Sequence, residues 1–262
     1  MLLEQTILDK LISKEKTQYY NLVEPLKLKA ARRPSKGDLI SIVIPTIGRW
    51  DLLAERALAS IEKQTHDHFE VIVVCDGCKV PDWIRGLYSW VTWVQIPKTK
   101  HYPEGPMYSW LVGPSVALNV GLRYVQGDWI ARIDDDDTWR PKMLETMLKF
   151  AEEGDYEFVS AAAKGPDGPI MPYRHPLCGS VQTWLYRSYL KCFEYNLDSW
   201  RKSWDRPNEI DLYKRMHKAG VRFGFKATIV SDINPRPGVK TIGSSAWVEE
   251  CERKTNEGMH EV

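Results

Sequence analysis

The sequence lacks three things: an excess of charge of one sign, a long hydrophobic run and a regular set of cysteines. Its 262 residues include 36 Lys and Arg against 35 Asp and Glu. This balance gives no overall field that would favour nucleic acid or a membrane surface as a partner. The apolar stretches are strand-sized and broken by Gly, Pro or charge, which argues against a transmembrane segment and a cleaved signal peptide. We therefore expect the protein in the cytoplasm.

Cysteine occurs only five times. An odd and scattered count favours reduced thiols over a disulfide framework. Cys75 and Cys78 have C-x-x-C spacing, but without a second pair a zinc or redox site is the weaker interpretation. The sequence also has no internal repeat, so its length fits one large α/β domain with small appendages.

Four consecutive carboxylates, Asp134 to Asp137, follow a strand-sized apolar run. Adjacent like charges repel and raise each other's pKa, which a bound cation would relieve. Because side chains alternate along an extended segment, Asp134 and Asp136 are expected on one side and Asp135 and Asp137 on the other. Such a D-x-D pair suits Mg²⁺ or Mn²⁺. The alternative is a solvated turn in which Asp137 or Thr138 caps a following helix.

Residues 1–38 differ in pattern from the rest of the chain. Apolar residues recur there at helical spacing, which predicts one or two helices: Leu3, Ile7, Leu8, Leu11 and Ile12. This stripe is expected to pack against the main domain, with a contact to a partner or to the acceptor as the alternative. A basic stretch follows, which is typical of a solvated linker, with a nucleic-acid arm as the alternative: Lys27, Lys29, Arg32, Arg33 and Lys36.

From residue 39 onward, strand-like runs alternate with helical patterns. The strands are predicted at 39–45, 69–75, 90–96 and 128–133, and the helices at 51–63 and 114–125. This alternation predicts an α/β fold with a mainly parallel sheet flanked by helices. Ligands collect beyond the carboxyl ends of such strands, so Asp76 and the four aspartates are expected at the ligand-binding edge. Residues 97–110 hold too many turn formers for a helix and are predicted to form a long loop that could act as a lid.

Five pieces of sequence occur in order between residues 40 and 150. They are Val43-Ile44-Pro45-Thr46 with Arg49; Leu58, Ser60, Ile61 and Gln64; Glu70 to Val74 with Asp76 and Gly77; Ala117, Asn119 and Gly121; and Gly127 to Leu144 around Asp134, Asp136, Asp137, Trp139 and Pro141. This ordered set resembles the family 2 glycosyltransferases, with a weaker continuation to about residue 220. The resemblance implies a GT-A type fold, in which 39–140 form the nucleotide-sugar-binding half and 141–262 the acceptor-binding and catalytic half.

The resemblance also implies which residues hold the donor, a nucleotide-diphosphate sugar for which the UDP type is favoured. Asp76 would accept the ring N–H of the base, although Asp-Gly is also a strong turn pair. Asp136 would hold a Mn²⁺ or Mg²⁺ ion that bridges the diphosphate, and Asp134 would approach that metal or the ribose. The implied donor contacts are Pro45, Thr46, Arg49, Asp76, Asn119, Asp134 and Asp135. One departure is Leu118, which stands where the family usually has Arg; Arg123 could replace that cation.

Sugar transfer with inversion needs a general base for the acceptor hydroxyl. The resemblance places this base at the start of a helix, where Glu209 aligns with the usual carboxylate and Asn208 replaces a usual acid. On a helix Glu209 and Asp211 point roughly 200° apart, so only one can reach the acceptor. Glu209 is favoured, and Asp211 and Asp205 are the alternatives. A purely structural role would be an acid that complements the helix dipole.

The acceptor side is less distinctive. Gly179, Ser180 and Trp184 resemble the acceptor half of the family, although a tryptophan is equally at home in a core. The family implies a saccharide or a lipid-linked saccharide as acceptor, and a hydroxylated nucleobase in DNA is the alternative. Two other classes stay open: a nucleotidyltransferase, for which residues 45–49 make a poor phosphate loop, and a non-catalytic nucleotide-sugar binder.

Overall fold

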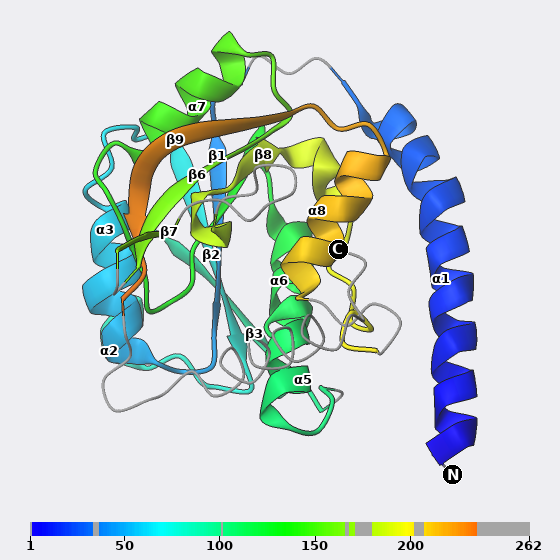
Figure 1. Cartoon of the computed structure of the whole chain (residues 1–262). Helices are drawn as coiled ribbons and strands as arrows, with labels where there is room; N and C mark the ends of the chain where they lie inside the picture. Colours follow the sequence, from blue (N-terminus) through cyan, green and yellow to red (C-terminus); the bar gives the residue numbers. More distant parts are fainter. Residues whose placement is uncertain are drawn as a thin grey trace.

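The computed structural model of the chain describes residues 2–33, 37–100, 102–165, 168–170, 180–201 and 207–234. Its strands are β1 (Ile40–Thr46), β2 (Phe69–Asp76), β3 (Val91–Ile96), β4 (Trp129–Arg132), β5 (Thr138–Trp139), β6 (Phe158–Gly165), β7 (Gly168–Ile170), β8 (Leu185–Arg187) and β9 (Phe223–Asp232). Within these residues the strands form one sheet in the order β3-β2-β1-β4-β8-β6-β9-β5, with β7 paired to β6 (Figure 1).

The first half of the sheet is parallel, as the alternating pattern predicts. Strands β2 and β4 both run parallel to β1, and β3 runs parallel to β2. The second half is mixed, because β8 is antiparallel to both β4 and β6, whereas β9 is parallel to β6. The prediction of an α/β fold with a mainly parallel sheet flanked by helices is therefore confirmed.

The helices cover both faces of this sheet (Figure 1). They are α1 (Leu2–Ala31), α2 (Trp50–Leu52), which continues through the π-helical turn η1 (Leu53–Leu58) into α3 (Ala59–Ile61), α4 (Asp82–Leu87), α5 (Pro106–Val112), α6 (Ser115–Tyr124), α7 (Met143–Glu153) and α8 (Asn208–Lys218). Two 3₁₀ turns, η2 (Val181–Thr183) and η3 (Ser188–Cys192), flank β8.

Helix α5 corrects the prediction of an uninterrupted loop over 97–110. Pro106 lies at the start of this helix, after Gly105, whose φ is +92°. Proline costs little there, because the first backbone N–H groups of a helix have no intrahelical partner. Turn-forming residues thus mark the beginning of α5 rather than the absence of a helix.

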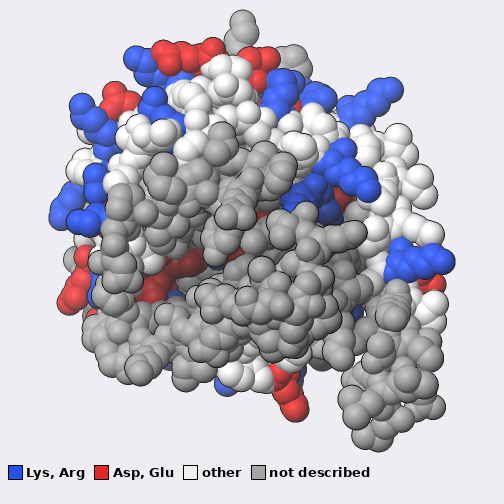
Figure 2. Space-filling view, viewed as in Figure 1, with Lys and Arg blue, Asp and Glu red and all other residues white. Residues whose placement is uncertain are grey.

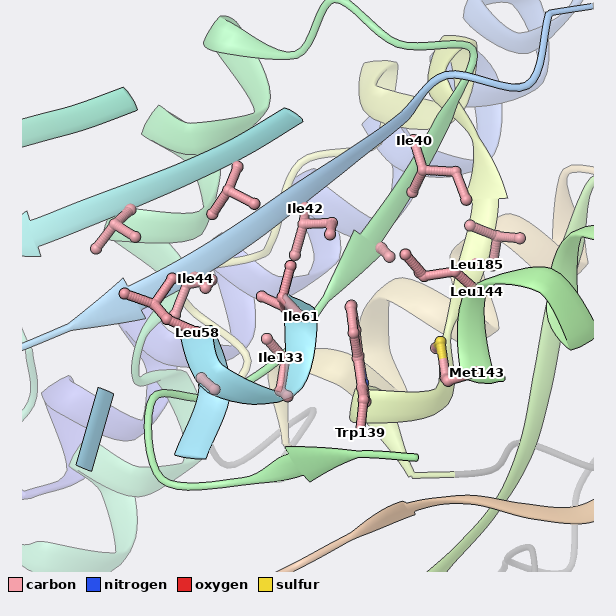
Figure 3. Close-up of a cluster of buried hydrophobic side chains, with 14 of the residues drawn as sticks. Ile40, Ile42, Ile44, Leu58, Ile61, Ile133, Trp139, Met143, Leu144 and Leu185 are labelled. Carbon is pink, nitrogen blue, oxygen red and sulfur yellow. The ribbon is translucent and has the colours of Figure 1, made fainter. Parts of the chain in front are cut away.

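Two hydrophobic clusters lie on opposite faces of the sheet, and β1 contributes to both. Ile40, Ile42 and Ile44 pack with residues of α3 and α7, as the close-up shows (Figure 3). Val43 points the other way, into the cluster formed with α6 and α8. This alternation follows the pleat of a strand buried on both faces. It fixes the end of β1 between the two layers of helices.

Helix α1 is one continuous helix, and its contacts differ from the predicted apolar stripe. Leu11 is 53% exposed, whereas Ser13, Glu24 and Leu28 are buried. Leu3, Ile7 and Leu8 have side chains outside the described set. The stripe prediction is thus wrong for Leu11, because polar groups and ion pairs form much of the contact between α1 and the domain. In the described part of the chain, none of the helices is both long and apolar enough to cross a membrane.

Candidate active site

The loops that follow β1 and β4 meet at the carboxyl edge of the sheet. The Thr46 hydroxyl donates a hydrogen bond of 2.6 Å to Asp135, and the Arg49 guanidinium also donates to Asp135. Arg49 Nη1 lies 3.5 Å from Asp136 Oδ2. Since β2 and β4 flank β1 on opposite sides, the strand order reverses at this point, where open α/β sheets bind their ligands. The segments at the ends of β1 and β4, which both carry predicted donor-binding residues, are therefore in direct contact.

The four aspartates form a turn rather than an extended segment. Strand β4 ends at Arg132, and the backbone N–H of Asp137 donates to the carbonyl of Asp134 at 3.2 Å. The expected strict alternation along a strand is therefore wrong. The alternative of a helix cap is also wrong, because strand β5 begins at Thr138.

The four carboxylates of the turn differ in exposure, and only Asp134 is not buried. Asp135 is enclosed by its contacts in the β1 loop, and Asp137 accepts hydrogen bonds from the Gln182 amide and from the backbone N–H of Asn234. The side chain of Asp134 is 29% exposed, and that of Asp136 is 8% exposed. Figure 2 shows some Asp and Glu side chains left of the middle of this face, and others at its edges together with Lys and Arg.

Burial sets the ionisation of the enclosed pair. Burial, followed by the charges of Asp134 and Asp136, raises the pKa of Asp137 to about 7. Burial also raises the pKa of Asp135, against the opposing effect of Arg49. The mutual repulsion expected from the sequence is thus present, and a nearby cation would favour the charged forms of these groups.

The aspartate turn fits a cation that is shared with a ligand. Among the described residues, no three or more His, Cys, Asp or Glu side chains gather into a group that could hold a metal. Mg²⁺ commonly binds through one or two carboxylates and completes its shell with waters and substrate phosphates. Asp134 and Asp136 provide a pair of this kind beside the cationic Arg49.

Arg132, which the sequence analysis did not single out, links Glu209 to the aspartate turn. Arg132, the last residue of β4, is 2% exposed and donates to Asp134 Oδ1 at 3.0 Å and to Glu209 Oε1 at 3.1 Å. Burial raises the pKa of Glu209, and Arg132 opposes that rise. A raised pKa makes a carboxylate a stronger proton acceptor. A lone charge inside an apolar strand was the signal that could have identified Arg132.

The alternative base Asp211 lies in a different environment. Its carboxylate is buried and accepts a hydrogen bond of 2.7 Å from Arg215 Nε, and Arg215 also donates to Glu24 of α1. Arg215 therefore joins α8 to α1 through Glu24, and Asp211 supports Arg215 from within α8, which gives this carboxylate a structural role. Asp205, the other alternative, lies outside the described residues.

Comparison with known proteins decides the family. Residues 41–227 match the model of glycosyl transferase family 2, which is more than half of the chain. The chain belongs to glycosyl transferase family 2.

Curated relatives of this family 2 glycosyltransferase include two proteins named for polysaccharide biosynthesis. It is 31% identical over 198 residues to WcaA of Escherichia coli (strain K12), named for colanic acid biosynthesis; the match covers 68% of this chain and 66% of WcaA. It is 29% identical over 140 residues to TuaG of Bacillus subtilis (strain 168), named for teichuronic acid biosynthesis, with 52% of each chain covered. The chain thus spans about two thirds or less of these relatives.

Solved structures support the same fold. TarS 1–349 of S. aureus in complex with UDP has a TM-score of 0.57 at 17% identity, with 82% of this chain and 71% of that chain covered. The mannosyltransferase PcManGT of Pyrobaculum calidifontis, in complex with GDP-Man and Mn²⁺, has a TM-score of 0.52 at 15% identity, with 91% and 70% covered. At this level of identity the likeness establishes the GT-A type fold.

Two predicted donor residues of the glycosyltransferase serve its fold. The Asn119 amide donates to the carbonyl of Tyr195 at 2.9 Å and accepts from the Tyr195 N–H at 2.8 Å. Both ends of this amide therefore serve the fold, and its predicted contact with the donor stays a prediction. Pro45 is buried within β1, directly before Thr46. Leu118 packs in the hydrophobic core, so the side chain at the position where the family usually has Arg makes no cationic contact.

Of the predicted acceptor residues, Trp184 lies in the core and Ser180 lies near the aspartate turn. Trp184 is 1% exposed and packs with its ring centroid 4.9 Å from that of Phe158. Its assignment to the acceptor is wrong, because a side chain enclosed in the core offers no face to a sugar. Ser180 donates to Gln182, which donates to Asp137, so this segment reaches the aspartate turn. Gly179 lies outside the described residues.

Asp76 ends β2 at the same edge of the sheet. Its Oδ1 accepts a hydrogen bond of 2.7 Å from the backbone N–H of Thr99, and Gly77 follows with a φ of +69°. The turn role that the sequence suggested is therefore real. It is compatible with donor binding, because a carboxylate has a second oxygen that can accept a base N–H.

Replacing Asp76 tests these two roles separately. Asp76→Ala is expected to weaken UDP binding by about 1–3 kcal/mol, the usual effect of losing a hydrogen bond to a charged group. Asp76→Asn keeps an oxygen for the Thr99 N–H but gives up one acceptor, so it should hold the melting temperature near that of the parent while still weakening UDP. Calorimetry and thermal melts measure both effects. Unchanged affinity in both variants would leave Asp76 as a turn residue only.

Proposed function

We propose that this protein is a metal-dependent, inverting glycosyltransferase. It would move a sugar from a nucleotide-diphosphate donor, favoured to be of the UDP type, to a hydroxyl of a saccharide or lipid-linked saccharide. The observation that carries the proposal is the connection of three groups at one sheet edge: the β1 loop, the aspartate turn and Glu209. Family membership supplies the reaction class.

The donor side of the proposal rests on the carboxyl ends of three neighbouring strands. Asp76 would receive the base from β2, and Thr46 would lie under the nucleoside at the end of β1. Asp136, assisted by Asp134, would bind the Mn²⁺ or Mg²⁺ ion, which would supply charge stabilisation for the departing diphosphate. Arg49, already paired with Asp135, places a permanent positive charge beside the same turn.

The acceptor side rests on Glu209. As the acceptor oxygen attacks the anomeric carbon, Glu209 would take its proton, and the bond from that carbon to the diphosphate oxygen would break. A carboxylate in this half-buried environment has a raised pKa, which suits it to accept a proton near neutral pH. Attack opposite the leaving group gives inversion at the anomeric carbon.

Saccharide acceptors are favoured over DNA by two observations. Relatives are named for the biosynthesis of colanic and teichuronic acids. In addition, Arg32 of the basic stretch, which motivated the DNA alternative, is committed to the fold: it forms two hydrogen bonds, of 2.7 and 2.8 Å, with the carboxylate of Glu157.

A donor panel tests the proposal. The protein is incubated with UDP-, GDP- and dTDP-sugars, with and without Mn²⁺, in the presence of saccharide acceptors, and the released nucleoside diphosphate is measured. We expect release from one nucleotide class, dependent on Mn²⁺ and increased by an acceptor. Release without any requirement for a divalent cation would contradict the metal-dependent mechanism. Tight binding of a nucleotide sugar without turnover would favour a non-catalytic binder.

A further inference from the structure

The buried guanidinium of Arg132 joins two elements that are far apart in sequence. Arg132 and Asp134 are two residues apart at the end of β4, and Glu209 is the second residue of α8, 77 positions further along the chain. Ile130, on the same side of β4, packs in the cluster that includes residues of α6 and α8. The pleat of β4 therefore directs Arg132 toward the helix that carries Glu209.

We propose that Arg132 is a positioning residue that holds the base Glu209 and the donor-site residue Asp134 in a fixed relation to each other. The inference rests on the proposed function, since it takes Glu209 as the base. Nη1 binds Glu209 and Nη2 binds Asp134, so each carboxylate has its own N–H donor on a single rigid plane. Arg132 donates to Oε1 of Glu209, and a carboxylate held by this one hydrogen bond still has lone pairs that can accept a proton.

Charge balance supports this role. Burial alone would favour the neutral form of Glu209, and the positive charge of Arg132 opposes that effect. Glu209 must be ionised to accept a proton, so Arg132 contributes to the state of the base as well as to its orientation.

The guanidinium itself rests on a fixed support. Its Cζ lies 5.7 Å from the ring centroid of Tyr195, and the Tyr195 backbone is bound on both sides by the amide of Asn119. This arrangement gives Asn119 a function consistent with its place in the sequence pattern: it fixes the residue behind Arg132. The chain of contacts runs from α6 to β4 and then to α8.

Arg132→Lys is the informative substitution. Lysine keeps the positive charge but has one nitrogen on a flexible stem, so it cannot present two separate N–H groups in the plane that joins both carboxylates. We expect kcat for UDP release from the donor that the panel selects to fall about 10–100-fold. The Kd for UDP in the presence of Mn²⁺ should change less than about threefold, because the direct donor contacts remain.

Arg187→Lys is the matched control. Arg187 lies on the neighbouring strand β8, opposite Trp129, with its Cζ 3.7 Å from that ring, and it is partly buried. The Arg187→Lys variant also removes a guanidinium from this sheet. Among the hydrogen bonds described, however, Arg187 makes none with Asp134 or Glu209. Its kcat should stay within about twofold of the parent, whatever the fall in melting temperature.

A double-mutant cycle with Glu209→Gln identifies what Arg132 acts through. If Arg132 positions the base, Arg132→Lys should cost less than about threefold once Glu209 is already Gln. The full 10–100-fold loss in that background, or an unchanged kcat in Arg132→Lys alone, would overturn the proposal. If Arg132→Lys does not fold, Arg132→Gln is used with the same criteria.

The same measurements separate this proposal from the proposed function. If Glu209→Gln retains full transfer, Glu209 is not the base, and both proposals fail together. If Glu209→Gln loses transfer while Arg132→Lys keeps it, the glycosyltransferase mechanism stands, and only the positioning role of Arg132 fails.

Discussion

Asp136→Ala is expected to abolish most sugar transfer and most of the thermal stabilisation that UDP gives in the presence of Mn²⁺. The side chain that would hold the cation is removed, so the positive charge that would balance the diphosphate would be lost with it. A ligand that binds only the folded state raises the melting temperature according to its concentration and affinity. Thermal melts with UDP, with and without Mn²⁺, therefore report on the site without any acceptor.

Two further variants make this result specific. Asp136→Asn keeps the size of the side chain near Arg49 but not its charge, so it should lose the Mn²⁺-dependent stabilisation while melting close to the parent without ligand. Asp67→Ala removes an exposed carboxylate from a loop before β2 and should leave every readout unchanged. Mn²⁺-dependent UDP stabilisation of normal size in Asp136→Ala would exclude Asp136 as the principal ligand.

Glu209→Gln should separate binding from chemistry. The amide has the same size as the acid and retains an oxygen to accept from Arg132, so affinity for UDP and Mn²⁺ should be nearly intact. It cannot take a proton, and transfer should fall by about a hundredfold to ten-thousandfold, the usual contribution of a general base. Steady-state transfer and calorimetry with UDP measure the two effects on the same preparation.

Asp211→Asn is the natural comparison, since it makes the same chemical change two residues further along α8. It weakens the ion pair with Arg215 in a buried setting, so it should lower the melting temperature and leave kcat of the folded protein within a few-fold. The reverse pattern, with transfer abolished in Asp211→Asn and retained in Glu209→Gln, would move the base to Asp211.

The sequence predicted the parts of this structure that depend on local pattern. Strands β1, β2 and β3, the helix that begins near residue 50 and α6 all follow from hydrophobic spacing and from the positions of Pro and Gly. The location of Asp76 and the aspartates at one edge followed from the parallel order of the strands. The opposite directions of Glu209 and Asp211 followed from helix geometry, and their different partners agree with it.

Side-chain partners far apart in sequence could not be predicted in this way. Nothing near Asn119 indicates that its amide binds the backbone at Tyr195, 76 residues away. Likewise, the enclosure of Trp184 depends on Phe158, which belongs to a different strand. An aromatic or amide residue suits both a binding surface and a core, and only the packing of distant elements decides between them.

The ion pair between Glu24 and Arg215 has a consequence for where the domain begins. The family match starts at residue 41, yet α1 ends ten residues earlier and is tied by Glu24 to the helix that carries Glu209. A chain that began at residue 41 would lack the Glu24 carboxylate that pairs with Arg215, and the side of α8 that faces α1 would be exposed. Helix α1 therefore packs against the family domain of this protein and supports the helix that carries Glu209.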